Sequence, residues 1–244
     1  MNCVYLSPSV QDFNEYLNGG NEELYMNLVT DSIAKYLDRY DICYKRNKPS
    51  MTLPEIIKES NAGDYALHLA IHSNASPESL SGELTGSEVY YFPNSMQGKI
   101  FSEILKNKIK TIYPDPENVS TKTTTSFGEL RRTSAPSSLV EIAYHDNPQD
   151  ERWIKENIDL IGKTIADAVY EYITLLNSCP INKKGTVVTM GGNLNLRQAP
   201  NTNSSVIAKL RLGSEIIILG CENGWFKIDY NGNVGYVLRK YISV

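Results

Sequence analysis

Residues 65–76 of this chain read YALHLAIHSNAS. The first seven residues, YALHLAI, are apolar enough to predict a strand in the middle of a sheet. Polar residues follow at once, in the segment HSNAS. In open α/β sheets, ligands gather at the carboxyl ends of the strands, so the end of this strand is a candidate functional site.

Two of the three histidines of the chain, His68 and His72, lie in this stretch. On a helix this spacing would let both bind one metal ion, but on a strand four residues span about 13 Å. Zinc ligands lie roughly 2.0–2.2 Å from the ion, so at most one of the two can bind a given ion. His72, which ends the apolar run, is the candidate ligand. We expect His68 to be a core or sheet-edge residue whose polar atoms are satisfied.

Strand and helix patterns alternate over the first 177 residues. Strands are expected at CVYL, ICYK, YALHLAI, SEVYYF and SLVEIAY, and helices at 22–40, 52–61, 95–112 and 149–176. This alternation predicts an α/β fold with a mostly parallel central sheet and helices on both faces. Beyond residue 185, short strand-like segments separated by turns predict a small all-β module. We therefore expect domains at 1–177 and 186–244, joined by a linker at 178–185.

Composition and charge narrow the classes of function. The chain has 244 residues, of which 41% are hydrophobic and 21% charged, an ordinary composition for a globular protein. It contains no run of 18 apolar residues, so no membrane span is predicted. The opening MNCVYLSPSV lacks the features of a secretory signal, which predicts synthesis in the cytoplasm and release by another route. Residues 178–244 hold eight Lys and Arg against three Asp and Glu, which favours an anionic surface as partner. The sequence lacks the dense basic stripe that would predict nucleic-acid binding. It contains no pattern from which an oligomeric state can be predicted.

The four cysteines, Cys3, Cys43, Cys179 and Cys221, are far apart and form no CxxC pair. This spacing disfavours a zinc knuckle or a thioredoxin-like site. For a chain made in the cytosol, we expect four reduced, structural thiols.

Glu141 lies among apolar residues in SLVEIAYHDN. Burial of a carboxyl group disfavours its charged form and raises its pKa, which suits a general base at a metal site. The alternative is a glutamate that faces solvent from an edge strand. His145, on the same predicted strand face, is a candidate for orienting a substrate.

The first 177 residues resemble zinc-dependent N-acetylmuramoyl-L-alanine amidases. The resemblance rests on LSPSVQ, NEELYMN, the RN pair at 46–47, AIHSNAS, GSEVYYF and ELRRTSAPSSLVEIAYHDN, in matching order and spacing. It implies a Zn²⁺ cofactor, His72 as a zinc ligand and Glu141 as the catalytic glutamate. It also implies cleavage of the amide bond between N-acetylmuramic acid and L-alanine.

The resemblance implies two further ligands. Glu23, which opens the first helix, matches the ligand glutamate, with its neighbour Glu22 as the alternative. The usual His-Gly-Gly after the first strand is replaced by LSPSVQDFN, an opening associated with a subgroup in which Gln11 would supply its amide oxygen. A neutral amide is a weaker ligand than imidazole, so lower zinc affinity is expected. Alternatively, Gln11 is a loop residue and water completes the coordination.

The stretch from LNLRQAP to RKYI resembles a bacterial SH3 domain, which implies binding to peptidoglycan. Its aromatic residues either contact the wall or belong to the core of the small barrel, and Trp225 and Tyr236 are candidates for either role. The expected function is thus a peptidoglycan hydrolase targeted to the cell wall, with a phage endolysin favoured over an autolysin. The alternatives are a wall-binding protein with an inactive amidase domain and a peptidoglycan endopeptidase. Neither a low-pKa cysteine at a helix start nor a phosphate-binding glycine loop before a helix is recognised, which disfavours a cysteine peptidase and a nucleotide enzyme.

Overall fold

A computed structural model describes residues 3–222 and 224–244. The chain divides into two compact units, one that ends at Tyr172 and one that comprises Ile173–Val244. Each unit has its own sheet, and the two are described separately below. Within the described residues, no helix is both long and apolar enough to cross a membrane.

The N-terminal unit is built on a six-stranded sheet in the order β2-β1-β3-β6-β4-β5. The only antiparallel neighbours in this described sheet are β4 and β6, so the sheet is mostly parallel, as predicted. The nearly continuous apolar β3 lies in the interior of the sheet, between β1 and β6. The strands are β1 (Cys3–Pro8), β2 (Tyr44–Arg46), β3 (Tyr65–Asn74), β4 (Ser87–Tyr91), β5 (Val119–Thr123) and β6 (Ser137–Tyr144).

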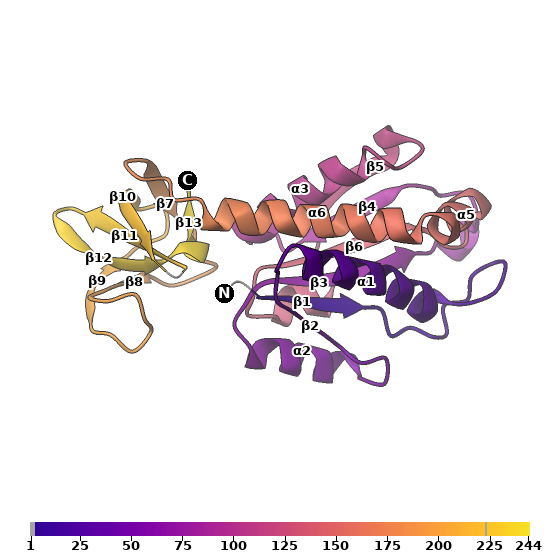
Figure 1. The fold of residues 1–244 in the computed structure, drawn as a ribbon, viewed down its shortest axis with the longest axis horizontal. Helices are drawn as coiled ribbons and strands as arrows, with labels where there is room; N and C mark the ends of the chain where they lie inside the picture. The colour runs from indigo at the N-terminus through magenta and orange to yellow at the C-terminus, as the bar shows by residue number, and fades with distance from the viewer. Residues whose placement is uncertain (1–2, 223) are drawn as a thin grey trace. The chain divides into compact units, whose positions relative to one another are not determined.

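Helices cover both faces of this sheet (Figure 1). On one face, Ser102 of α3 hydrogen-bonds Ser138 of β6. On the other, Leu130 of α4 packs on Ala70 of β3. Figure 1 shows α1 and α6 on the same side as α3. On the other side, α2 contacts α4. The helices are α1 (Glu22–Arg39), α2 (Leu53–Ala62), α3 (Met96–Ile109), α4 (Gly128–Arg132), α5 (Pro148–Glu156) and α6 (Ile158–Asn177).

The helix ends follow from local sequence. Asn21 caps α1 by accepting a hydrogen bond from the backbone N–H of Leu24, and Thr52 and Glu55 form the capping box that begins α2. The single helix predicted over 149–176 is wrong, because the chain breaks it at Asn157 into α5 and α6. The backbone N–H and the side-chain amide of Asn157 both donate to the carbonyl of Trp153, which closes the first helix.

The expectation of four reduced thiols is also wrong. Cys3 and Cys43 form a disulfide, and so do Cys179 and Cys221. The first pair arises from the sheet: Val4 of β1 is in register with Tyr44 of β2, which brings the preceding residues together. The second pair joins the segment after α6 to β10 of the C-terminal unit.

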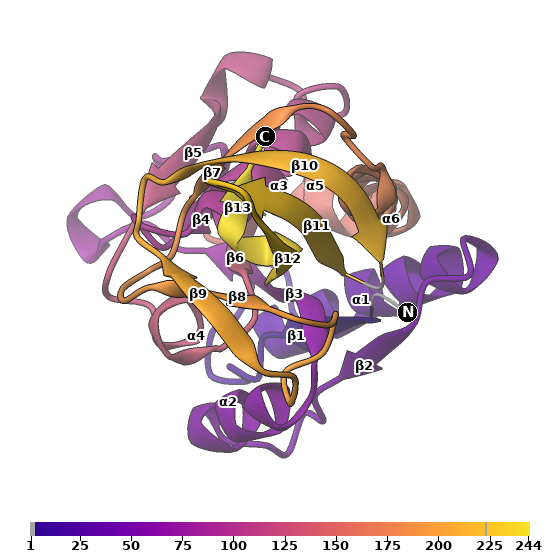
Figure 2. The same ribbon diagram turned by 90° about the vertical axis from the view of Figure 1, so that its left-hand side faces the viewer.

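The C-terminal unit is a seven-stranded sheet whose neighbouring strands are antiparallel, in the order β13-β7-β10-β11-β12-β8-β9 (Figure 2). Its first strand begins at Lys184, inside the segment expected as linker. Trp225 and Phe226 are buried, whereas Tyr230, Tyr236 and Tyr241 are partly exposed. The strands are β7 (Lys184–Val187), β8 (Leu194–Arg197), β9 (Val206–Leu210), β10 (Glu215–Glu222), β11 (Trp225–Tyr230), β12 (Asn233–Leu238) and β13 (Ile242–Ser243).

Candidate active site

A row of three polar side chains crosses the centre of the N-terminal sheet. Glu141 of β6 is in register with His72 of β3 on one side and with Glu88 of β4 on the other. Residues in register on neighbouring strands point to the same face of a sheet, so the three side chains share one face. The row lies towards the carboxyl end of β3, where the sequence predicted the site.

The imidazole of His72 meets donor atoms from the loop after β1 and from the start of α1. His72 Nδ1 lies 2.8 Å from Glu22 Oε1 and 3.4 Å from Gln11 Nε2. The side-chain amide of Asn14 donates to both neighbours, at 2.6 Å to Glu22 Oε2 and 3.1 Å to Gln11 Oε1. The four side chains therefore form one connected polar cluster.

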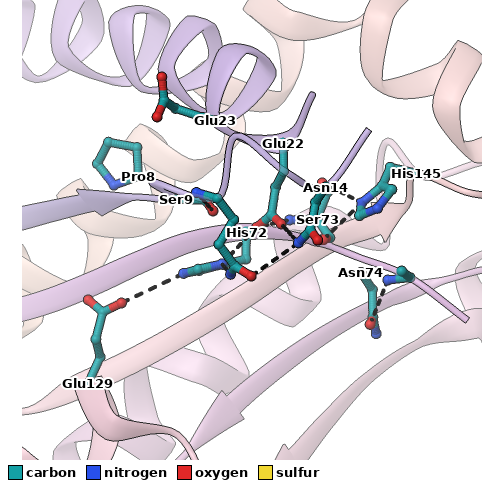
Figure 3. Close-up of polar contacts among 12 residues, drawn as sticks. Pro8, Ser9, Asn14, Glu22, Glu23, His72, Ser73, Asn74, Glu129 and His145 are labelled. Atoms are coloured by element: carbon teal, nitrogen blue, oxygen red, sulfur yellow. Dashed lines mark hydrogen bonds and ion pairs between the residues drawn. The ribbon is translucent and has the colours of Figure 1, made fainter. Parts of the chain in front are cut away.

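Glu22, not Glu23, reaches this cluster. The side chain of Glu22 points towards His72, whereas that of Glu23 points away from it (Figure 3). Consecutive helical residues project about 100° apart around the axis, so two adjacent glutamates cannot share one direction. Glu22 is also only 1% exposed, so its carboxylate is buried beside His72. The geometry thus favours the alternative glutamate over the one that the motif indicated.

The cluster is electrostatically coupled. Burial acts to raise the pKa of Glu22, but hydrogen bonds with His72 and Asn14 hold this pKa below its usual range. Burial acts to lower the pKa of His72, yet the carboxylates of Glu129, Glu22 and Glu141 raise it well above the usual value. In the absence of a metal, the carboxylates around His72 thus favour the charged form of its imidazole.

Glu141 differs from the other carboxylates. Burial raises its pKa to about 7; the neighbouring His72 acts against this rise, and the charges of Glu22 and Glu88 add to it. Its Oε2 atom is buried and has no hydrogen-bond partner among the residues that the structure describes. Such a carboxylate can take up a proton near neutral pH, which is the property of a general base.

Glu129, on the single-turn helix α4, approaches the opposite edge of the His72 ring. Its Oε1 lies 3.7 Å from His72 Nε2, and the residue is 6% exposed. The sequence had placed Glu129 in the ELRR motif without assigning a role to it. Asn14 carried no signal in the sequence either, because its function depends on a loop conformation.

The other two histidines, His68 and His145, lie outside the polar cluster that His72 forms with Glu22, Gln11 and Asn14. His68 is fully buried and bonded on both ring nitrogens, by Ser60 at 2.8 Å and by Glu129 at 2.6 Å, as expected for a satisfied core residue. His145 follows β6, stacks on Tyr16 and is hydrogen-bonded through Nδ1 to Ser73. These contacts fix the orientation of the His145 ring, and its substrate-orienting role stays a prediction.

The donor atoms around His72 Nδ1 fit a zinc ion in part. No three His, Cys, Asp or Glu side chains are grouped to hold a metal ion in the described part of the chain. His72 Nδ1 and Glu22 Oε1 nevertheless form the imidazole and carboxylate pair that zinc accepts, and Gln11 stands beside them. Its amide nitrogen faces His72, so a half-turn of the amide presents the oxygen instead. With that turn, the three residues fit a weak zinc site.

Comparison with known proteins identifies the family. The sequence of residues 10–171, more than half of the chain, matches the family described as N-acetylmuramoyl-L-alanine amidase. The chain belongs to this family. Residues 192–243 match the family described as bacterial SH3 domain, which agrees with the predicted C-terminal module.

The individual relatives and solved structures that the chain resembles share 20–25% sequence identity with it. The probable autolysin PH of Staphylococcus aureus is 25% identical over 278 residues, a match that covers 93% of this chain and 55% of the relative. The chain spans about half the length of the curated relatives it matches first. The amidase AmiC2 of Nostoc punctiforme has the same fold, with a TM-score of 0.64 at 20% identity over 71% of this chain and 97% of that one. Cwp6 from Clostridium difficile gives 0.64 at 24% identity, over 70% and 29% of the two chains.

Proposed function

We propose that this chain hydrolyses the amide bond between N-acetylmuramic acid and L-alanine in peptidoglycan, with zinc as its cofactor. The observation that carries the proposal is the register of His72 and Glu141, which sets a ligand and a base of pKa about 7 side by side on one face of the sheet. Membership of the amidase family supports the choice of bond.

In this proposal, each residue has a distinct task. Zinc would supply a Lewis acid that polarises the scissile carbonyl and lowers the pKa of water. Glu22 and His72 would hold the ion, with Gln11 as the third donor after its amide turns away from Asn14. Asn14 would orient Glu22 by donating to its Oε2. Glu141 would take the proton of the attacking water on its unpartnered Oε2 and return it to the leaving amine of L-alanine.

Product analysis tests the proposal directly. Purified peptidoglycan is digested with the zinc-loaded chain, with and without a chelator, and the products are separated by mass spectrometry. An amidase releases peptides that begin with L-alanine, and the chelator abolishes that release. New ends inside the peptide would favour the endopeptidase, and no product at all would favour the inactive wall-binding protein.

We further propose that the C-terminal module carries the chain to the cell wall. Its family and its net positive charge support this role. Deleting residues 178–244 removes the module together with both cysteines of its disulfide and should weaken sedimentation with purified walls, while leaving cleavage of soluble muropeptides. Equal wall binding by the truncated chain would contradict the targeting role. A phage origin stays a prediction, and a neighbouring holin gene would support it.

A further inference from the structure

The two histidines of β3 are linked by one buried carboxylate. Glu129 Oε2 lies 2.6 Å from His68 Nε2, and Glu129 Oε1 lies 3.7 Å from His72 Nε2. The line continues beyond His68, whose Nδ1 lies 2.8 Å from Ser60 Oγ. Figure 3 shows Glu129 and Glu22 on opposite sides of His72. One end of the line thus lies in α2, and the other lies at the candidate metal ligand.

This arrangement is costly for a protein core. His68 and Glu129 are 0% and 6% exposed. Leu130, the neighbour of Glu129 in α4, packs with Ala70 of β3 and Leu139 of β6 in an apolar cluster. Taking ionisable groups out of water disfavours folding unless they are well paired, and apolar residues of similar size often stabilise as well or better. The line of groups therefore points to a role beyond packing.

The two contacts of His72 are unequal and have different consequences. Its Nδ1 atom faces Glu22 and Gln11, whereas Nε2 is buried, faces Glu129 and lacks a hydrogen bond within the described residues. At 3.7 Å the Glu129 contact is an ion-pair separation that orients the ring electrostatically. Because Oε2 is held by the short contact to His68, the carboxylate has a fixed direction from which to act.

We propose that Glu129 is a positioning residue for the metal centre, with His68 and Ser60 as its anchors. It keeps Nε2 of His72 directed into the core and Nδ1 directed towards Glu22, so that the ring offers Nδ1 to the metal. Metal-bound histidines commonly donate their second N–H to a carboxylate, and loss of that partner costs about 10–100-fold in metal affinity. This inference rests on the proposed zinc chemistry.

The test measures the zinc affinity of the full chain by competition with a chromogenic chelator. Glu129→Gln keeps the side-chain volume but removes the charge that serves both imidazoles, and it should weaken zinc binding by about 10–100-fold. The matched control is Glu59→Gln, which removes a carboxylate bonded to Tyr5, the residue whose ring stacks on His68, without touching either histidine. The control should stay within about twofold of the wild type.

Two further readouts separate positioning from stability. The Nε2–H signal of His72 in ¹H–¹⁵N spectra of the zinc-loaded chain should be present in the wild type and lost in Glu129→Gln. A merely structural role would lower the thermal midpoint and leave both this signal and the zinc affinity of the folded chain unchanged. If Glu129→Gln fails to fold, Ser60→Ala removes only the distal anchor and should weaken zinc binding by about twofold to fivefold.

The outcomes are distinguishable. Zinc binding by Glu129→Gln within twofold of the wild type, or an unchanged affinity in Ser60→Ala where that variant is used, overturns the positioning role and leaves the proposed hydrolase intact. A wild-type chain that binds no zinc overturns the metal chemistry and the positioning role together.

Discussion

His72 and Glu141 are register partners on the adjacent parallel strands β3 and β6, and both side chains point to the same face of the sheet. The pairing brings a potential metal ligand next to a carboxylate with an unpartnered buried oxygen among the described residues. Two residues that are 69 positions apart in the sequence therefore meet without any contribution from a flexible loop. The core strands β3 and β6 therefore position both residues of the proposed active site.

The choice between Glu22 and Glu23 can be tested with a matched pair of variants. Glu22→Gln should weaken zinc binding by more than about tenfold, because it removes the carboxylate charge beside His72 Nδ1. Glu23→Gln should leave zinc affinity unchanged, since its side chain points away from the cluster. Chelator competition measures both affinities, and the reverse order would restore the ligand indicated by the motif.

Gln11 can be tested by removing its donor and by improving it. Gln11→Ala should lower zinc affinity, whereas Gln11→His should raise it, because imidazole is a stronger zinc ligand than a neutral amide. Calorimetric titration of the metal-free chain with zinc measures both effects. Equal affinities in the wild type and both variants would favour the alternative in which Gln11 is a loop residue.

The pKa of Glu141 predicts a dependence of stability on pH in the metal-free chain. The unfolded chain ionises this group near its ordinary pKa of 4.5, whereas burial raises the folded-state pKa to about 7. The contribution of the neutral Glu141 carboxyl to the free energy of unfolding is thus fully present below pH 4.5. It is lost as the pH rises to about 7. Glu141→Gln avoids this loss, so its advantage over the wild type in free energy of unfolding should grow by about 2–3 kcal/mol between pH 5 and pH 8.

Chemical denaturation at a series of pH values, with a chelator present, measures this difference. Glu103→Gln is a suitable control, because hydrogen bonds with Lys106 and Thr121 lower the pKa of Glu103. The stability advantage of this control should shrink, not grow, as the pH rises from 4 to 5. If the difference in free energy of unfolding between Glu141→Gln and the wild type does not change from pH 5 to pH 8, Glu141 is already ionised in the folded chain at pH 5. That result would contradict the raised pKa.

The disulfide between Cys179 and Cys221 should stabilise the C-terminal unit. The two cysteines are 42 residues apart, and closing a loop of that length contributes about 4 kcal/mol through the entropy of the unfolded chain. The double variant Cys179→Ser with Cys221→Ser should therefore unfold at a lower denaturant concentration. Hydrogen exchange of the amides of β10 and β11 reports on this unit alone, and a loss below about 1 kcal/mol would contradict the prediction.

Much of the fold was predictable because its strongest signals are local. The apolar run of β3 and the capping box of α2 each identify an element without knowledge of the rest of the chain. β5 and α4 were not predicted, because one is a short strand of mostly polar residues at the edge of the sheet and the other is a single turn. The break at Asn157 was also missed, since a long apolar periodicity continues across it.

The site was predictable only in part, for reasons of geometry. His72 and Glu141 lie on strands that the sequence predicts, and His72 lies at a strand end where ligands gather in α/β sheets. Their register is visible only in the structure. The choice of Glu22 depends on the rotational phase that the Asn21 cap sets for α1, which a motif alone does not define. Glu129 belongs to a single-turn helix 61 residues from His68, so its meeting with that histidine is visible only in three dimensions.

The most direct measurement is the release of free L-alanine amino ends from soluble muropeptides by the zinc-loaded wild type and by Glu141→Gln, with bound zinc quantified in both. General-base catalysis contributes about 10²–10⁴-fold to a rate. The wild type should release these ends, and the variant should retain its zinc and its fold while losing at least about a hundredfold in rate. A variant that keeps its zinc and hydrolyses within tenfold of the wild type would contradict the role of Glu141 on which the proposed mechanism depends.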